Sequence, residues 1–85
     1  MPAYRVEILP AAVRQLGRID FGPRRRLDTA IRELADDPRP PGCRKLTGAE
    51  AYRVRVGDYR ILYEIEDAVL RILVVKVGHR RDVYE

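Results

Sequence analysis

The stretch Tyr52-Arg-Val-Arg-Val-Gly-Asp-Tyr-Arg60 decides the fold, because its pattern predicts a β-hairpin with a defined register. Apolar residues alternate with arginines, and Gly57-Asp58 supplies a two-residue turn. In that register Arg55 lies directly opposite Arg60, and Arg53 shares their face. Like charges in such positions destabilise a sheet, so this arrangement indicates a bound anion, and a phosphodiester backbone fits best.

The length and composition predict one folded domain over residues 1–85. Charged residues make up 35% of the chain and no low-complexity tract interrupts it, which excludes the disordered class. Lys and Arg number 17 against 13 Asp and Glu, a net charge of +4 that is compatible with nucleic acid but does not establish it.

The sequence gives no sign of a cofactor, a metal site or a membrane segment. The single cysteine, Cys43, excludes an intramolecular disulfide and a cysteine-only metal site. No apolar run is long enough to cross a bilayer, and the amino terminus lacks a signal-peptide core. We therefore expect a cytoplasmic protein that does not contact membranes.

The amino-terminal half predicts one strand and two helices. Residues 3–9 alternate between apolar and polar side chains, as in a strand with one buried side. A short helix begins at Pro10 and ends near Gly17, with an apolar stripe of Val13, Leu16 and Ile19. A longer helix begins at Gly22-Pro23 and ends before Asp37-Pro38; its apolar residues are Leu27, Ala30, Ile31, Leu34 and Ala35.

The carboxy-terminal half predicts a sheet built around the hairpin. Residues 37–42 hold three prolines and form an extended crossing, and residues 43–48 form a short edge strand or an ordered loop. A strand over 59–66 turns at Asp67-Ala68 into a strand over 69–77, whose apolar character predicts a central position covered on both sides.

Pairing Glu66 with Val69 across that turn assigns the two faces of the sheet. The helices cover a face made by Ile61, Tyr63, Ile65, Leu70, Ile72 and Val74. The opposite face carries the arginines with Leu62, Leu73, Val75, Val77 and a cross-strand pair of Glu64 with Arg71. The prediction is an α+β fold, an antiparallel-rich four- to five-stranded sheet packed on two amino-terminal helices.

The tail Gly78-His-Arg-Arg-Asp-Val-Tyr-Glu85 concentrates polar and aromatic side chains. A bend at Gly78 would bring Arg80 and Tyr84 to the edge of the arginine-bearing face. Cleaving RNA through its ribose 2′-hydroxyl requires a base, fixed cations and an acid. The hairpin arginines suit the cationic task, Tyr84 suits stacking or orienting the nucleotide, and His79 is a candidate for proton transfer.

Several blocks of the sequence are similar to toxins of the RelE/ParE superfamily from type II toxin–antitoxin systems, on the RelE side. These blocks are Lys45-Leu-Thr-Gly48, Tyr52-Arg-Val-Arg55, Gly57-Asp-Tyr-Arg-Ile-Leu-Tyr63 and Val77-Gly-His-Arg-Arg-Asp-Val-Tyr84. The resemblance implies a RelE-like fold with a concave face similar to that of microbial ribonucleases. It implies an endoribonuclease that cleaves mRNA in the ribosomal A site without a metal and so inhibits translation. It also implies a RelB-like antitoxin, with operator DNA bound only through the toxin–antitoxin complex.

Position by position, the resemblance assigns a catalytic set with companions. Its members are Arg53 and Arg55 as paired basic residues, Arg60 as the phosphate ligand, Arg80 and Tyr84, with Lys45 and Arg81 as substrate contacts. Studied relatives carry lysines at the positions of Arg53 and Arg55, and a lysine can act as a base whereas arginine hardly can. The base is therefore His79, or there is no strong base. The carboxy-terminal helix of some relatives has no counterpart after Glu85.

Two other functions stay open at this point. A ParE-like toxin would inhibit DNA gyrase and cleave nothing, and it would not need Arg60, Arg80 and Tyr84. A toxin remnant would act mainly as a DNA-binding corepressor together with its antitoxin, and its expression alone would not arrest growth.

Overall fold

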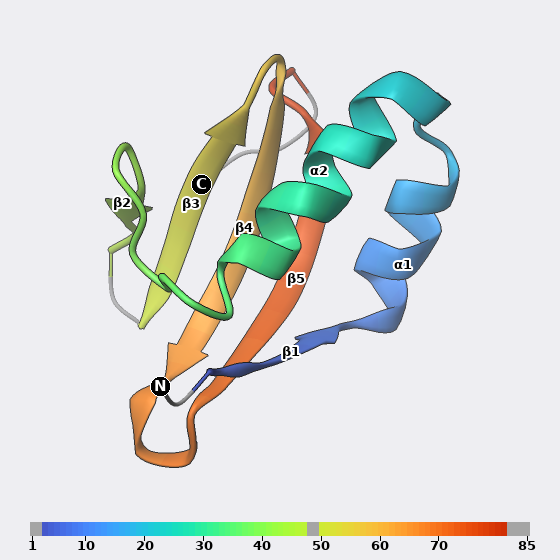
Figure 1. Ribbon diagram of the computed structural model, residues 1–85. Coiled ribbons are helices and arrows are strands. Elements are labelled where there is room, and N and C mark those ends of the chain that lie inside the picture. The colour runs from blue at the N-terminus through green and yellow to red at the C-terminus, as the bar shows by residue number, and fades with distance from the viewer. Residues whose placement is uncertain (1–2, 48–49, 82–85) are drawn as a thin grey trace.

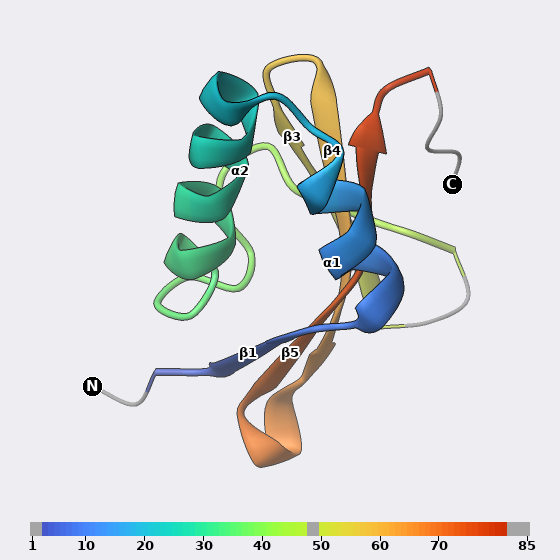
Figure 2. The same cartoon turned by 90° about the vertical axis from the view of Figure 1, so that its right-hand side faces the viewer.

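Two helices pack on one face of a five-stranded sheet in the computed structural model, which describes residues 3–47 and 50–81 (Figure 1, Figure 2). The elements are β1 (Arg5–Ile8), α1 (Pro10–Gly17), α2 (Phe21–Glu33), β2 (Arg44–Lys45), β3 (Ala51–Val56), β4 (Tyr59–Glu66), a 3-10 turn (Asp67–Val69) and β5 (Arg71–His79). The strand order is β1-β5-β4-β3-β2; β1 runs parallel to β5 and every other pair is antiparallel. The predicted α+β fold is confirmed.

α1 begins where its sequence signal places it, whereas α2 begins at Phe21, one residue before the predicted start, and ends at Glu33, so that Leu34 and Ala35 lie beyond it. Pro10 occupies the first turn of α1, where no amide donor is needed, and α1 packs on β5 while α2 packs on β3 and β4. The predicted stripe of α1 is wrong at Val13, which is 53% exposed; the fully buried residue is Ala12, one position earlier. No helix within the described ranges is long and apolar enough to cross a membrane.

The β3–β4 hairpin has the predicted register. Val56 lies opposite Tyr59, and Arg55 lies opposite Arg60. Gly57 has a φ of +60°, a left-handed conformation that glycine adopts without a steric penalty, and this permits the tight turn. The strands therefore place their arginines on one face and their buried residues on the other.

The β4–β5 connection is longer than the sequence predicted. A 3-10 turn over Asp67–Val69 replaces the two-residue turn, and Glu66 lies opposite Arg71 instead of Val69. Leu70, expected on the helix-covered face, lies in the turn, has a left-handed φ of 51° and is 39% exposed. The predicted pair of Glu64 with Arg71 is also wrong, because Arg71 forms ion pairs with Glu66 and Glu7.

A β-bulge in β5 reverses the orientation of the side chains after Val74. Tyr63 lies opposite Val74, but the next residue of β4, Leu62, lies opposite Lys76, so that Val75 is the additional residue. Val77 is consequently buried on the helix-covered face, where the sequence predicted the opposite. The strand does occupy the predicted interior position, but the helices cover only one of its faces.

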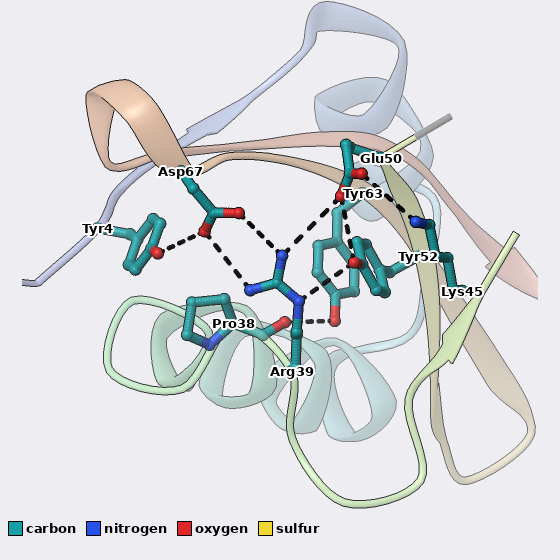
Figure 3. A network of polar contacts seen from close by, with 8 residues as sticks. All are labelled: Tyr4, Pro38, Arg39, Lys45, Glu50, Tyr52, Tyr63 and Asp67. Carbon is teal, nitrogen blue, oxygen red and sulfur yellow. Dashed lines mark hydrogen bonds and ion pairs between the residues drawn. The ribbon is translucent and has the colours of Figure 1, made fainter. Parts of the chain in front are cut away.

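A polar network fastens the proline-rich segment after α2 to the end of the sheet away from the hairpin turn (Figure 3). The Arg39 guanidinium donates hydrogen bonds to the Asp67 carboxylate at 2.9 Å and to the Tyr52 hydroxyl at 3.1 Å. The buried Tyr63 donates its hydroxyl hydrogen to the Pro38 carbonyl at 2.7 Å. Burial, followed by the nearby Cys43, raises the pKa of Tyr63, which therefore remains a neutral donor.

Candidate nucleic-acid interface

Four arginines from three strands form one surface on the side of the sheet away from the helices. We call this surface, made by Arg44, Arg53, Arg55 and Arg60, the arginine face. Strand pairing arranges it in two rows that run across the strands. The first row is Arg55, Arg60 and Gly78, and the second is Arg44, Arg53, Leu62 and Lys76.

Arg53 is the most enclosed member of the arginine face, with 8% of its surface exposed. Burial, followed by the positive charges of Arg60, Arg44 and Arg55, lowers its pKa. An arginine stays protonated through such a shift, so the shift measures repulsion and lost hydration rather than a loss of charge. A phosphate placed here would relieve both, and the fold holds the cations in position before it arrives.

The tail residues are only partly described. The backbone amide of Arg80 donates to the Asp58 carbonyl at 2.8 Å, which anchors Arg80 beside the hairpin turn and next to the first row. Figure 2 shows the chain leaving β5 on the side of the sheet opposite α2. Arg81 is exposed at the end of this segment. Tyr84 lies outside the described residues.

His79 lies on the helix-covered face, away from the arginine face. It is opposite Tyr59, and the two rings make an edge-to-face contact with centroids 5.6 Å apart. Its Nδ1 accepts a hydrogen bond from the Arg81 amide at 3.2 Å, and it lines a small pocket beside Gln15 of α1. The sheet therefore separates His79 from the arginines that it was expected to assist, and the bulge in β5 is the cause.

In β2, Arg44 lies on the arginine face, whereas the predicted substrate contact Lys45 lies on the other side of the sheet. Lys45 lies opposite Tyr52, on the helix-covered side, and its ammonium group contacts Glu50 at 3.4 Å (Figure 3). Arg44 lies opposite Arg53 and so joins the arginine face. Arg44 could not be placed from the sequence because a two-residue strand carries no alternation pattern, and only the pairing of β2 with β3 tells which side chain faces which side.

A second surface feature is a groove of about 1150 Å³ between α2 and the hairpin. Phe21, Ala30, Leu34, Val54 and Val56 supply its apolar lining, with Arg25 and Arg26 near the start of α2 and Glu33, Asp36 and Asp37 near its end. Phe21 is 66% exposed, which is unusual for a phenylalanine. We call this feature the α2–β3 groove.

Solved structures that are similar in fold include toxins of toxin–antitoxin systems. The RelE–RelB complex of Pyrococcus horikoshii matches with a TM-score of 0.84 and 29% identity, over 95% of this chain and 99% of that one. The RelBE2 complex of Mycobacterium tuberculosis matches with a TM-score of 0.79 and 26% identity, over 92% and 99%. The YoeB/ParE toxin of Agrobacterium tumefaciens, at 17% identity and a TM-score of 0.75 over 88% and 96%, shares the fold.

One sequence comparison also points to a toxin–antitoxin system. No sequence among curated proteins matches the chain significantly. The sequence model for the ParE toxin of the type II toxin–antitoxin system parDE matches residues 6–84. That match spans nearly the whole domain, including the hairpin and the tail. The chain therefore belongs to the ParE toxin family of type II toxin–antitoxin systems, within the RelE/ParE superfamily.

Proposed function

We propose that this toxin is a ribosome-dependent endoribonuclease that cleaves mRNA in the A site and so inhibits translation. The observation that carries the proposal is the arginine face, where Arg53 is held among three like charges at a cost in repulsion and hydration. A protein that stabilises the extra negative charge of a phosphorane gains from such a cluster.

In this mechanism the ribose 2′-hydroxyl attacks the adjacent phosphorus atom and the bond to the 5′ oxygen breaks. Arg53, Arg55 and Arg60 hold the phosphate and stabilise its additional charge with planar, paired donors. Arg80, anchored beside the hairpin turn, assists the departing oxygen, and Tyr84 positions the nucleotide. No metal ion takes part in these steps.

The ribosome supplies what this face lacks. His79 lies on the other side of the sheet, and arginine is a poor proton acceptor at neutral pH. The rate must then come from orientation of the 2′-hydroxyl and from charge stabilisation, and a ribosome that fixes the mRNA conformation provides the orientation. This dependence places the activity in the cytoplasm.

A RelB-like antitoxin is the proposed protein partner. The RelE structures from Pyrococcus horikoshii and Mycobacterium tuberculosis are complexes with their antitoxins. In this chain the α2–β3 groove offers an apolar surface of suitable size. The part of β3 past the two residues that pair with β2 lies at the edge of the sheet, beside this groove. Operator DNA would be bound through the antitoxin in that complex.

Primer extension on an mRNA translated in the presence of the toxin tests the nuclease. We expect cuts in phase with the codons, and we expect Arg60→Ala to reduce cleavage at least 100-fold, since one preorganised donor contributes on the order of 10²-fold to rate. Arg32→Ala on α2, outside the arginine face, is the matched control and should cleave normally. Cleavage by Arg60→Ala at the control's rate would refute the proposed site, provided that circular dichroism shows both variants folded.

Inhibition of DNA gyrase is the second candidate, because the matching family model describes the ParE toxin. A supercoiling assay with purified gyrase separates the two functions. Loss of supercoiling without codon-phased cuts would identify a gyrase inhibitor. Codon-phased cuts with unaffected supercoiling would identify the nuclease.

A further inference from the structure

Charge on the side of the sheet away from the helices is divided along the strand direction. The half nearer the hairpin turn carries the arginine face and Lys76. The next row away from the turn carries Glu64 and Glu7, which lie on either side of Leu73. Beyond this acidic row the cations are already partnered by carboxylates, since Arg71 pairs with Glu66 and Glu7.

Lys76 belongs to the cationic half because of the bulge. Without the additional residue Val75, the alternation of β5 would direct Lys76 to the helix-covered face and Val77 to the other. With it, Arg53, Leu62 and Lys76 form one row across β3, β4 and β5, with Lys76 roughly 10 Å from Arg53 at two strand spacings. Within residues 3–47 and 50–81 no carboxylate forms an ion pair with Lys76.

We propose that Lys76 is a second phosphate contact and that the RNA backbone runs across the strands, from Arg44 on β2 toward Lys76 on β5. In the acidic row, the exposed Glu64 repels phosphates from the far half of the sheet and so restricts the backbone to the cationic half, while Glu7 is paired with Arg71 and Arg5. The partly exposed Leu62 separates Arg53 from Lys76 and presents an apolar surface between the two phosphate contacts. This inference rests on the proposed function, because it deepens the same substrate site.

The position of Lys76 suits binding rather than chemistry. It lies on β5 past the last residue that pairs with β1, where it also borders the pocket beside α1, and β4 separates it from Arg53. A lysine there acts as a flexible point charge that follows the backbone of a neighbouring nucleotide. Its removal should weaken binding of RNA and leave the rate of the bound complex nearly unchanged.

The test measures binding of a short fluorescent 2′-O-methyl RNA, which cannot be cleaved, by anisotropy between roughly 50 and 200 mM salt. For Lys76→Ala we expect several-fold weaker binding and a salt slope smaller by about 0.7, the value for one phosphate contact on a single strand. Lys76→Arg should bind normally. The matched control is Arg5→Ala, which removes one positive charge from the same side of the sheet beyond the acidic row, and it should leave both quantities unchanged.

A complementary variant tests the acidic row. Glu64→Gln should increase affinity and should allow Arg5→Ala, when combined with it, to affect binding. The inference is overturned if Lys76→Ala and Arg5→Ala have the same affinity and salt slope. It is also overturned if single-turnover cleavage on programmed ribosomes by Lys76→Ala falls at saturating toxin, since that would make Lys76 part of the chemistry.

The second phosphate contact and the proposed function can be refuted separately. Arg60→Ala serves as the reference in the same titration. If it weakens binding while Lys76→Ala does not, only the second phosphate contact is wrong. If neither variant weakens binding, the arginine face is not the RNA site, and the proposed function fails with it.

Discussion

Arg53 combines burial with three like-charged neighbours, so the residue proposed to hold the phosphate also has a cost in stability. Its lowered pKa is the sign of that cost. An apolar residue at this position would lose the repulsion and need no hydration. Natural active sites often keep such unfavourable arrangements, because the ligand repays them.

We therefore expect Arg53→Met to stabilise the toxin while disabling it. The free energy of unfolding should rise by up to about 1 kcal/mol, since each like-charged cross-strand neighbour costs a few tenths of a kcal/mol. Urea unfolding measures this, with growth inhibition scored in parallel. Arg14→Met on α1, at an exposed position, is the control. A stability gain no greater than the control's, or full toxicity, would contradict the prediction.

Asp67 gives the fold an acid-sensitive connection between its segments. Its carboxylate accepts hydrogen bonds from Arg39 at 2.9 Å and from the Tyr4 hydroxyl at 2.6 Å. These two donors, Arg39 first, lower the pKa of Asp67 in the folded protein. A lowered pKa means that the stabilisation is complete above the unfolded pKa, roughly 3.9, and is lost as the pH falls toward the folded value.

Asp67→Asn should accordingly lower the melting temperature at neutral pH and change it less as the pH falls below about 4. The physical reason is that protonation removes from the wild type what the substitution removes permanently. Thermal unfolding followed by circular dichroism between neutral pH and pH 3 measures the difference. Asp28→Asn, at a surface pair with Arg32, is the control. A difference in melting temperature that is constant across this range would refute the explanation.

At the scale of elements, the bulged strand β5 depends on a side chain from α1. β1 pairs with β5 only through Arg71–Val74. Beyond that point the Gln15 side chain accepts a hydrogen bond from the Val77 amide at 2.8 Å. The Gln15 side chain of α1 thus supplies a hydrogen-bond acceptor to β5 where β1 ends. It satisfies a backbone donor that would otherwise lie in a partly buried site without a partner.

Gln15→Ala should reduce the free energy of unfolding by about 1 to 2 kcal/mol, because the Val77 amide would lose its acceptor. Gln15→Glu keeps an acceptor oxygen and should recover most of that loss. Amide hydrogen exchange at Val77 offers a local readout: protection should fall in the alanine variant and persist in the glutamate variant. Equal exchange at Val77 in all three proteins would show that the contact contributes nothing.

For the whole molecule, the two surfaces with proposed functions lie on different sides. The arginine face is on the side of the sheet away from the helices, and the α2–β3 groove lies between the helix layer and the hairpin. Arg55 contributes to both, since it also lines the groove. A partner seated in the groove would therefore contact the hairpin that presents the proposed RNA site.

We expect Phe21→Ser to weaken antitoxin binding about tenfold while leaving toxicity in the absence of antitoxin unchanged, since truncation of an exposed aromatic anchor typically costs more than 1 kcal/mol. Val13→Ser is the matched control, because Val13 is an exposed apolar residue on α1 outside the groove. Isothermal titration calorimetry with the cognate antitoxin measures the affinity. Equal affinities for the two variants would place the antitoxin elsewhere.

The sequence by itself determined the hairpin, most of the helix-covered core and the order of elements. These follow from local patterns: alternation around Gly57-Asp58, apolar spacing in α2 and Pro10 at the start of α1. It also placed Arg55 opposite Arg60, because a two-residue turn leaves one register.

Only the tertiary structure decided which side chains after Val74 join the arginines. Val74 and Val75 are both apolar, so the sequence does not tell where the side chains change face, and the additional residue Val75 is accommodated only when β5 pairs with β4. That single bulge moves Lys76 onto the cationic half and Val77 and His79 away from it. The pairing of β2 likewise selects Arg44 over Lys45. Both outcomes depend on contacts between strands, which a local pattern does not encode.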